Sequence, residues 1–132
     1  MSRSGYYDDI DNWELIKWRG AVTSAIRGRR GQAFLREMLA ELDALPKKRL
    51  IPNDLVRDGE VCAIGAVAVA RGLDVSDIDP EDRDQVAAAF GIATALAAEI
   101  EDMNDERFYG SPEERFAKMR RWVETHIKKD TQ

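Results

Sequence analysis

The sequence predicts a mainly α-helical protein, a compact bundle of five or six helices with a small β-hairpin near residues 49–61. Three observations support this prediction. Apolar residues recur at helical spacing through most of the 132 residues. Proline, glycine and capping residues divide the chain into segments of helical length. Only the stretch 49–61 departs from the helical period, and it contains turn-forming pairs of residues.

A chain of this length is expected to form one domain. We therefore treat residues 1–132 as a single helical domain, with flexible ends expected at 1–10 and 129–132. The sequence has one cysteine, no apolar run long enough to cross a bilayer and no secretory signal at its start. These features predict a cytoplasmic protein without disulfides and without membrane contact.

Two helices are expected in the first part of the chain. The first runs from about residue 11 to Arg27, and Gly28 breaks it. The second runs over about 32–45, and Pro46 stops it. The apolar residues of this second helix share one face, which is expected to lie in the core: Phe34, Leu35, Met38, Leu39, Leu42 and Leu45.

The middle of the chain contains an Asp58-Gly59 pair, which interrupts the helical pattern. This pair lies between apolar segments and predicts a short hairpin that joins residues 50–51 to Val61. The residues from 61 to 71 are small and apolar nearly all round, and Gly72 follows them as a helix-ending residue. That profile predicts a buried helix at the centre of the bundle.

The last part of the chain contains two strong helix starts. The residues DPED at 79–82 predict a helix with Asp79 as its cap and proline at its first position, reaching Phe90. A further helical stripe covers 92–103. The residues SPEE at 111–114 form the pattern of a capping box, so a final helix is expected after them.

Cys62 is the single candidate for a reactive nucleophile. Such a cysteine needs a base within hydrogen-bond distance and a polar, partly open setting. The only histidine is His126, which could reach Cys62 only if the last helix packed on the 61–71 helix. Because Cys62 stands among valine, alanine and isoleucine, a buried core residue is the favoured interpretation. The glycines around it match no phosphate-binding pattern, so we predict that the protein is not an enzyme.

The side chains available for a metal site are few. One histidine and one cysteine cannot form a structural zinc site, and the acidic residues near 77–84 do not follow the calcium-loop pattern. Glu99, Asp102 and Glu106 share one helix face and could form half of a carboxylate site. A solvated helix face is the simpler interpretation, and we predict neither a metal nor another cofactor.

Acidic residues are concentrated in the second half of the chain. The formal net charge is −5, and the segment 74–106 holds eleven acidic residues and one basic residue. Such a surface repels phosphate backbones, so nucleic acid is not expected as a partner, whereas a basic protein surface would be attracted. The candidate partner-binding residues are the densest acidic residues and one loop aromatic: Asp77, Asp79, Glu81, Asp82, Asp84 and Tyr109.

An alternative candidate site lies between the first two helices. Arg27, Arg29 and Arg30 surround the end of one helix and the start of the next. Arginines at a helix end can hold the phosphates of a nucleotide. The other interpretation of these residues is ordinary turn charge.

Several segments together resemble a known group of proteins. They are GRRGQAFLREMLAELDALPKKRLI at 28–51, DGEVCAIGAV at 58–67, DPED at 79–82 with FGIA at 90–93, and the Asn-Asp pair at 104–105. In these segments the chain is similar to small proteins encoded by tailed phages and prophages of proteobacteria, over about residues 10–122. The resemblance implies a bacterial host cell and assigns no site residues.

In that context we expect a non-catalytic protein that binds a host bacterial protein, such as a component of antiviral defence, and inhibits or redirects it through an acidic face. The alternative is a protein that binds or sequesters a nucleotide through the arginines. A helical domain with exposed aromatic residues also allows a homodimer.

Overall fold

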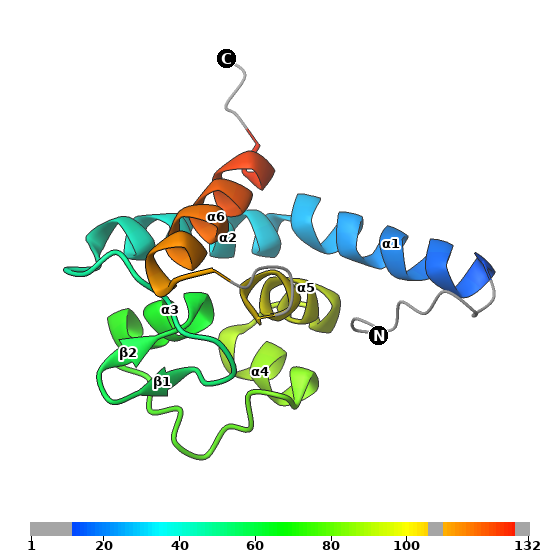
Figure 1. The fold of residues 1–132 in the computed structure, drawn as a ribbon. Helices are drawn as coiled ribbons and strands as arrows, with labels where there is room; N and C mark the ends of the chain where they lie inside the picture. Colours follow the sequence, from blue (N-terminus) through cyan, green and yellow to red (C-terminus); the bar gives the residue numbers. More distant parts are fainter. Residues whose placement is uncertain (1–11, 106–109, 129–132) are drawn as a thin grey trace.

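The computed structural model describes residues 12–105 and 110–128, which form six α-helices and one two-stranded antiparallel sheet (Figure 1). The helices are α1 (Asn12–Arg27), α2 (Arg29–Ala44), α3 (Ala63–Arg71), α4 (Arg83–Phe90), α5 (Thr94–Asp105) and α6 (Pro112–His126). The strands are β1 (Val56–Arg57) and β2 (Glu60–Val61). The prediction of a mainly helical protein with a small hairpin is confirmed.

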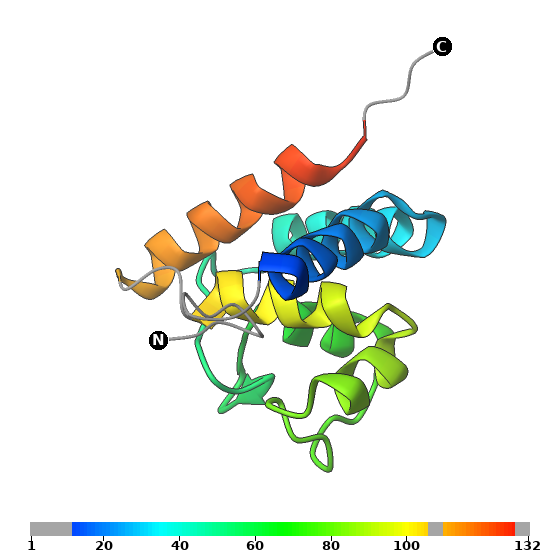
Figure 2. The same cartoon turned by 90° about the vertical axis from the view of Figure 1, so that its right-hand side faces the viewer.

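The helices lie in three layers, which Figures 1 and 2 show from two sides. α2 lies between α6 on its outer side and α3 on its inner side, and α1 packs against both α2 and α5. α3 and α5 contact each other and form the middle layer. The hairpin and α4 lie on the side opposite α6, where α4 packs on α5.

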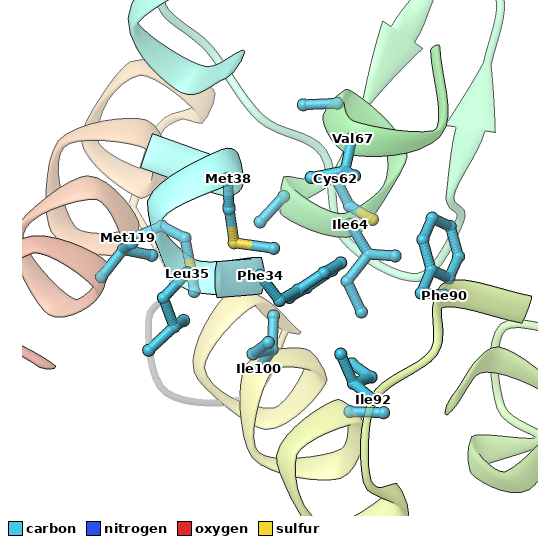
Figure 3. Close-up of a cluster of buried hydrophobic side chains, with 14 of the residues drawn as sticks. Phe34, Leu35, Met38, Cys62, Ile64, Val67, Phe90, Ile92, Ile100 and Met119 are labelled. Carbon is cyan, nitrogen blue, oxygen red and sulfur yellow. The ribbon is translucent and has the colours of Figure 1, made fainter. Parts of the chain in front are cut away.

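Apolar side chains from all three layers meet in one core (Figure 3). The predicted stripe of α2 supplies Leu35, Met38 and Leu42, and all three are fully buried. The ring of Phe34 meets that of Phe90 edge to face, with 6.0 Å between centroids, and so joins α2 to α4. The first six residues of α3 are buried, which confirms the predicted central helix.

Two glycines allow backbones to touch where a side chain would prevent it. A Cβ atom added at Gly65 in α3 would lie 1.8 Å from the carbonyl oxygen of Leu55. A Cβ added at Gly31 in α2 would lie 1.8 Å from the carbonyl oxygen of Ala25 in α1. Gly65 therefore sets how closely the segment before β1 packs on α3, and Gly31 sets the approach of α1 to α2.

The side chain of Gln32, in the first turn of α2, fixes the end of α6. Its Nε2 donates to the carbonyl oxygens of Ile26, at 2.8 Å, and His126, at 3.0 Å. Its Oε1 accepts from the backbone N–H of Lys128 at 2.8 Å. This buried amide thus joins the α1–α2 junction to the residues at the end of α6.

The hairpin has the predicted turn but a different first strand. Asp58 and Gly59 have φ values of 53° and 81°, as a two-residue type I′ turn requires. That short turn brings its immediate neighbours into register, so β2 pairs with β1 through Val56↔Val61 and Arg57↔Glu60. The predicted pairing of residues 50–51 is reduced to one hydrogen bond, from Ile51 N to Val61 O at 2.9 Å, on the other edge of β2.

The start of α4 also differs from the prediction. Asp79 was expected to cap this helix, but its Oδ1 instead accepts from Glu81 N at 2.9 Å within a turn. Asp82 is the cap, and its Oδ1 accepts from Gln85 N at 3.1 Å. Both aspartates can serve as caps, and the turn that Asp79 forms delays the helix by three residues. The capping box predicted at Ser111 is confirmed at the start of α6.

Candidate functional site

The predicted acidic residues lie on the segment that joins α3 to α4 and on the first turn of α4. Within residues 73–82, which we call the connection, Leu73, Val75 and Ile78 are half-buried and pack on the core. The polar residues between them point outward. All five predicted acidic residues are exposed: Asp77, Asp79, Glu81, Asp82 and Asp84. The connection is thus anchored by its apolar side chains and presents carboxylates to solvent.

The hydrogen bonds of these carboxylates are local. Asp79 and Asp82 accept from backbone N–H groups nearby, and Asp84 accepts from the hydroxyl of Thr94 at 2.9 Å. In the part of the chain that the structure describes, none of the five forms an ion pair with a lysine or arginine. Their negative charge is therefore not neutralised by these described residues and remains available to a basic surface.

The amide of Gln85 holds the connection in place. Its Oε1 accepts from the backbone N–H of Asp79 at 3.0 Å, and its Nε2 donates to the carbonyl oxygen of Asp77 at 3.3 Å. Gln85 itself is exposed on α4. The backbone of the acidic segment is thus positioned by bonds that water can reach.

A groove of about 500 Å³ separates the connection from the hairpin. We call it the connection groove, and it is lined by Asp54, Leu55, Val56, Val69, Leu73, Asp74, Val75, Ser76, Ile78 and Pro80. Val69 on α3 is 60% exposed and Val56 on β1 is 39% exposed, unusually high values for large apolar side chains here. The groove therefore combines an open apolar surface with carboxylates at its edges.

A second and more polar hollow of about 330 Å³ is lined by Asn53, Glu81, Arg83, Glu101 and Asp105. Arg83 forms an ion pair with Glu101 across this hollow, with 2.8 Å between nitrogen and oxygen. A smaller cavity of about 20 Å³, large enough for roughly one water molecule, shares four of these lining residues and extends inward to Cys62. Of the five predicted acidic residues, Glu81 lines the polar hollow.

Cys62 is a structural residue in its surroundings. It caps α3, with its Sγ accepting from Gly65 N at 3.3 Å, and it is buried. Burial raises the pKa of its thiol to about 12, so the thiol is not ionised at neutral pH. His126 lies on α6, which packs on α2, and its Nδ1 is 2.7 Å from the carbonyl oxygen of Trp122. The favoured interpretation of Cys62 as a core residue is confirmed.

A buried polar cluster joins α5 to the start of α3, to the segment before β1 and to α6. Asn104 Oδ1 accepts from Ala63 N at 3.2 Å, and Asn104 Nδ2 donates to Ile51 O at 2.9 Å. The neighbouring Asp105 accepts from Asn53 N at 3.2 Å, and the guanidinium of Arg115 donates to the carbonyl oxygen of Asn104. We call the side chain of Asn104 with its two backbone partners the amide clamp. Its only signal in the sequence is an Asn-Asp pair at the end of an apolar stripe, and such a pair predicts no more than a helix end.

The three carboxylates predicted to share a solvated face of α5 do not behave as one set. Asp102 is fully buried, so the prediction of a solvated face is wrong for this residue. The helix turns Asp102 toward the protein interior beside the buried Ala98, whereas Glu99 is half-buried. Glu106 lies outside the described residues. Among those that are described, no group of three histidine, cysteine or acidic side chains is placed to hold a metal ion.

The alternative arginine site lies at the α1–α2 junction, far along the chain from the connection. Arg27, Arg29 and Arg30 are all exposed there. The Nη1 of Arg30 donates to the carbonyl oxygen of Gly91 at 3.3 Å, at the end of α4, so this arginine also links two elements. The remaining predicted residue, Tyr109, lies outside the described residues.

Comparisons with models of protein families, with curated proteins and with solved structures found no match for this chain. In residues 12–105 and 110–128, no helix combines the length and the apolar character that a membrane span needs.

Proposed function

We propose that this protein is a non-catalytic interaction protein, encoded by a phage or prophage, that binds a host protein in the bacterial cytoplasm and inhibits or redirects it. The observation that carries this proposal is the set of exposed carboxylates on the connection and the start of α4, without ion pairs among the described lysines and arginines. The predicted context of a phage or prophage suggests the kind of partner, a protein of the host cell.

Charge of one sign on one segment favours a partner of the opposite sign. Several exposed carboxylates within a few residues create a local negative potential, which speeds the encounter with a basic surface and rejects acidic ones. The connection is already held by Leu73, Val75 and Ile78 against the core. Less ordering is therefore needed on binding than for a free acidic tail, and less binding free energy is lost to it.

The proposed function is tested by capturing host proteins from a nuclease-treated bacterial lysate on a tagged protein. A charge variant, Asp77→Asn, Glu81→Gln and Asp84→Asn, removes three of the carboxylates and keeps the acceptor oxygen of Asp84 for Thr94. A matched control, Glu14→Gln, Glu113→Gln and Glu124→Gln, removes three exposed carboxylates on α1 and α6. Both variants raise the formal net charge from −5 to −2.

We expect one host protein at near-stoichiometric amounts on the wild type and the control, and a loss of at least about tenfold on the charge variant. Equal loss on both variants would show that only net charge matters and would contradict the acidic face. If a nucleotide raised the melting temperature, and Arg27→Gln with Arg29→Gln abolished that rise, the nucleotide-binding alternative would replace the proposal.

A further inference from the structure

Among the described residues, no backbone group pairs with the edge of β1 that faces away from β2, and this edge lies beside the connection groove. The Arg57↔Glu60 pair adjoins the two-residue turn, and Leu55 O accepts from Cys62 N at 3.1 Å. In an antiparallel ladder, hydrogen-bonded pairs alternate with non-bonded pairs, so Val56 directs its N–H and C=O away from β2. In Figure 1 the connection passes on the β1 side of the hairpin, and both segments line the same groove.

The groove also has apolar side chains next to the outer edge of β1. Val56 and Val69, which are 39% and 60% exposed, line the groove together with Leu73 and Ile78. Its volume of about 500 Å³ lies within the range of roughly 300–1,000 Å³ that protein ligand pockets occupy. An aliphatic side chain placed there would cover apolar surface that is now in contact with water.

Negative charge lies along the same groove. Asp74 is in the lining, and its side chain accepts from Ser76 N at 2.9 Å, an interaction that lowers the pKa of its carboxyl group and keeps it ionised. Asp77 and Asp79 stand on either side of Ile78 and are exposed. Asp54 is also in the lining, but it is paired with Arg57 at 2.8 Å. Asp74 thus places one carboxylate without an ion pair among the described residues in the lining, and Asp77 and Asp79 add negative charge on the same connection outside the lining.

We infer that the connection groove binds an extended segment of the partner protein, in which an aliphatic side chain is flanked by lysine or arginine. The segment adds to the outer edge of β1 through the N–H and C=O of Val56, and its aliphatic side chain lies on Val69. A cation of the segment faces Asp74 in the lining, and the exposed Asp77 and Asp79 of the same connection add to the negative potential that attracts it. Strand addition of this kind draws affinity from main-chain hydrogen bonds and specificity from the side chains. The inference rests on the proposed function, because it names the partner segment that the acidic face receives.

The test is selection from a displayed library of random dodecapeptides on three immobilised proteins. They are the wild type, Val69→Arg, which places a bulky cation in the groove, and Ile16→Arg, a matched control. Ile16 is 60% exposed on α1, as Val69 is on α3, so both changes replace an equally exposed aliphatic residue. A consensus peptide is then titrated by fluorescence anisotropy against all three proteins.

We expect the wild type and Ile16→Arg to select peptides with a central valine, isoleucine or leucine beside basic residues, and Val69→Arg to bind the consensus at least about tenfold more weakly. Val56→Arg should act in the same way and serves as the second variant if Val69→Arg melts at a lower temperature. Full binding by both groove variants, or a consensus without basic residues, would overturn the inference. So would a dimer in sedimentation that Val69→Arg dissociates, because the occupant would then be a second copy of the chain.

The result is separable from the test of the proposed function. If the charge variant no longer captures the host protein while Val69→Arg captures it fully, the result supports binding through the acidic face and contradicts the inference about the groove. If Val69→Arg no longer binds the selected peptides while the charge variant captures the host protein normally, the result supports peptide binding in the groove. It contradicts the proposed function through the acidic face.

Discussion

Asn104 in α5 and Gln85 in α4 each use one side-chain amide to hold two backbone groups outside their own helix. Asn104 binds Ala63 N and Ile51 O beside the hairpin, and it is only 2% exposed. Gln85 binds Asp79 N and Asp77 O of the connection, and it is exposed. When a buried amide is removed, its partners lose their hydrogen bonds without gaining water, whereas the partners of an exposed amide are solvated at once.

This difference gives the connection groove two unlike walls. The chain is held by buried hydrogen bonds on both sides of the hairpin, at Ile51 and Ala63, so we expect the hairpin wall to open at a higher free-energy cost than the connection wall. The connection wall is held by half-buried apolar side chains and by bonds in contact with water, so it can adjust locally at lower cost. We therefore expect the β1 wall to be the less mobile of the two and the connection wall to be the more adjustable.

The largest expected effect comes from Gly65→Ala, which tests the fixed wall. The new Cβ would lie 1.8 Å from the carbonyl oxygen of Leu55, so the hairpin segment must move away from α3. We expect the free energy of unfolding in urea to fall by at least about 3 kcal/mol, at the upper end of overpacking effects. Unchanged stability would show that the hairpin is not fixed against α3.

Gly20→Ala is the matched control for that change. Gly20 lies in α1, and a Cβ there meets nothing within 4 Å. Alanine has the higher helix propensity, so this variant should be more stable than the wild type by about 0.5–1 kcal/mol. The opposite signs of the two glycine changes would separate the steric effect from helix propensity.

The second prediction concerns Asn104→Ala, which removes the amide clamp. Two buried backbone groups, Ala63 N and Ile51 O, would lose their hydrogen bonds. We expect a loss of about 2–3 kcal/mol in the free energy of unfolding, together with faster amide hydrogen exchange in the hairpin. A loss below 1 kcal/mol would mean that water replaces the amide and that the two walls are alike.

The third prediction uses the Cys62 thiol at the base of the fixed wall. Its pKa is raised by burial from 9.0 to about 12, so ionisation favours the unfolded chain. The stabilising contribution is therefore fully present below about pH 9 and is lost as the pH rises toward 12. Between pH 9 and 10 the stability of the wild type should fall by about 1 kcal/mol more than that of Cys62→Ala. Parallel pH profiles of the two proteins would contradict this.

The smallest effect is expected from Gln85→Ala on the adjustable wall. Both of its hydrogen bonds are in contact with water, so the free energy of unfolding should fall by no more than about 0.5 kcal/mol. Hydrogen exchange should quicken in the connection while exchange in the hairpin stays unchanged. A loss as large as that of Asn104→Ala would remove the distinction between the two walls.

Local pattern was enough to predict most of the elements. The apolar stripe of α2, the small residues of α3 and the capping box of α6 each depend on neighbours within one or two turns. The sequence does not decide the start of α4, because Asp79 and Asp82 both suit a cap and the choice depends on the turn between them. The predicted strand partner of β2 is wrong, because a two-residue turn at 58–59 pairs the residues directly next to it, Arg57 with Glu60 and Val56 with Val61.

Only part of the candidate site can be predicted from the sequence. Exposure of the acidic residues follows from their charge, and the structure agrees. The connection groove combines residues 54–56, Val69 and six of the residues from 73 to 80, which no local pattern brings together. In the amide clamp, Asn104 is 41 residues from Ala63 and 53 residues from Ile51. Periodic patterns in the sequence relate only near neighbours, so they do not predict these contacts. Tyr109 stays a prediction, because it lies outside the described residues.

The bond from Gln32 to His126 has a consequence for the way the chain is made. These residues are 94 positions apart, so the contact cannot form on the ribosome until nearly the whole described chain has emerged. Until then the face of α2 that receives Phe116, Met119 and Val123 from α6 remains uncovered. A nascent chain halted before residue 112 would therefore expose an apolar stripe of the kind that chaperones bind, until α6 is translated and covers it.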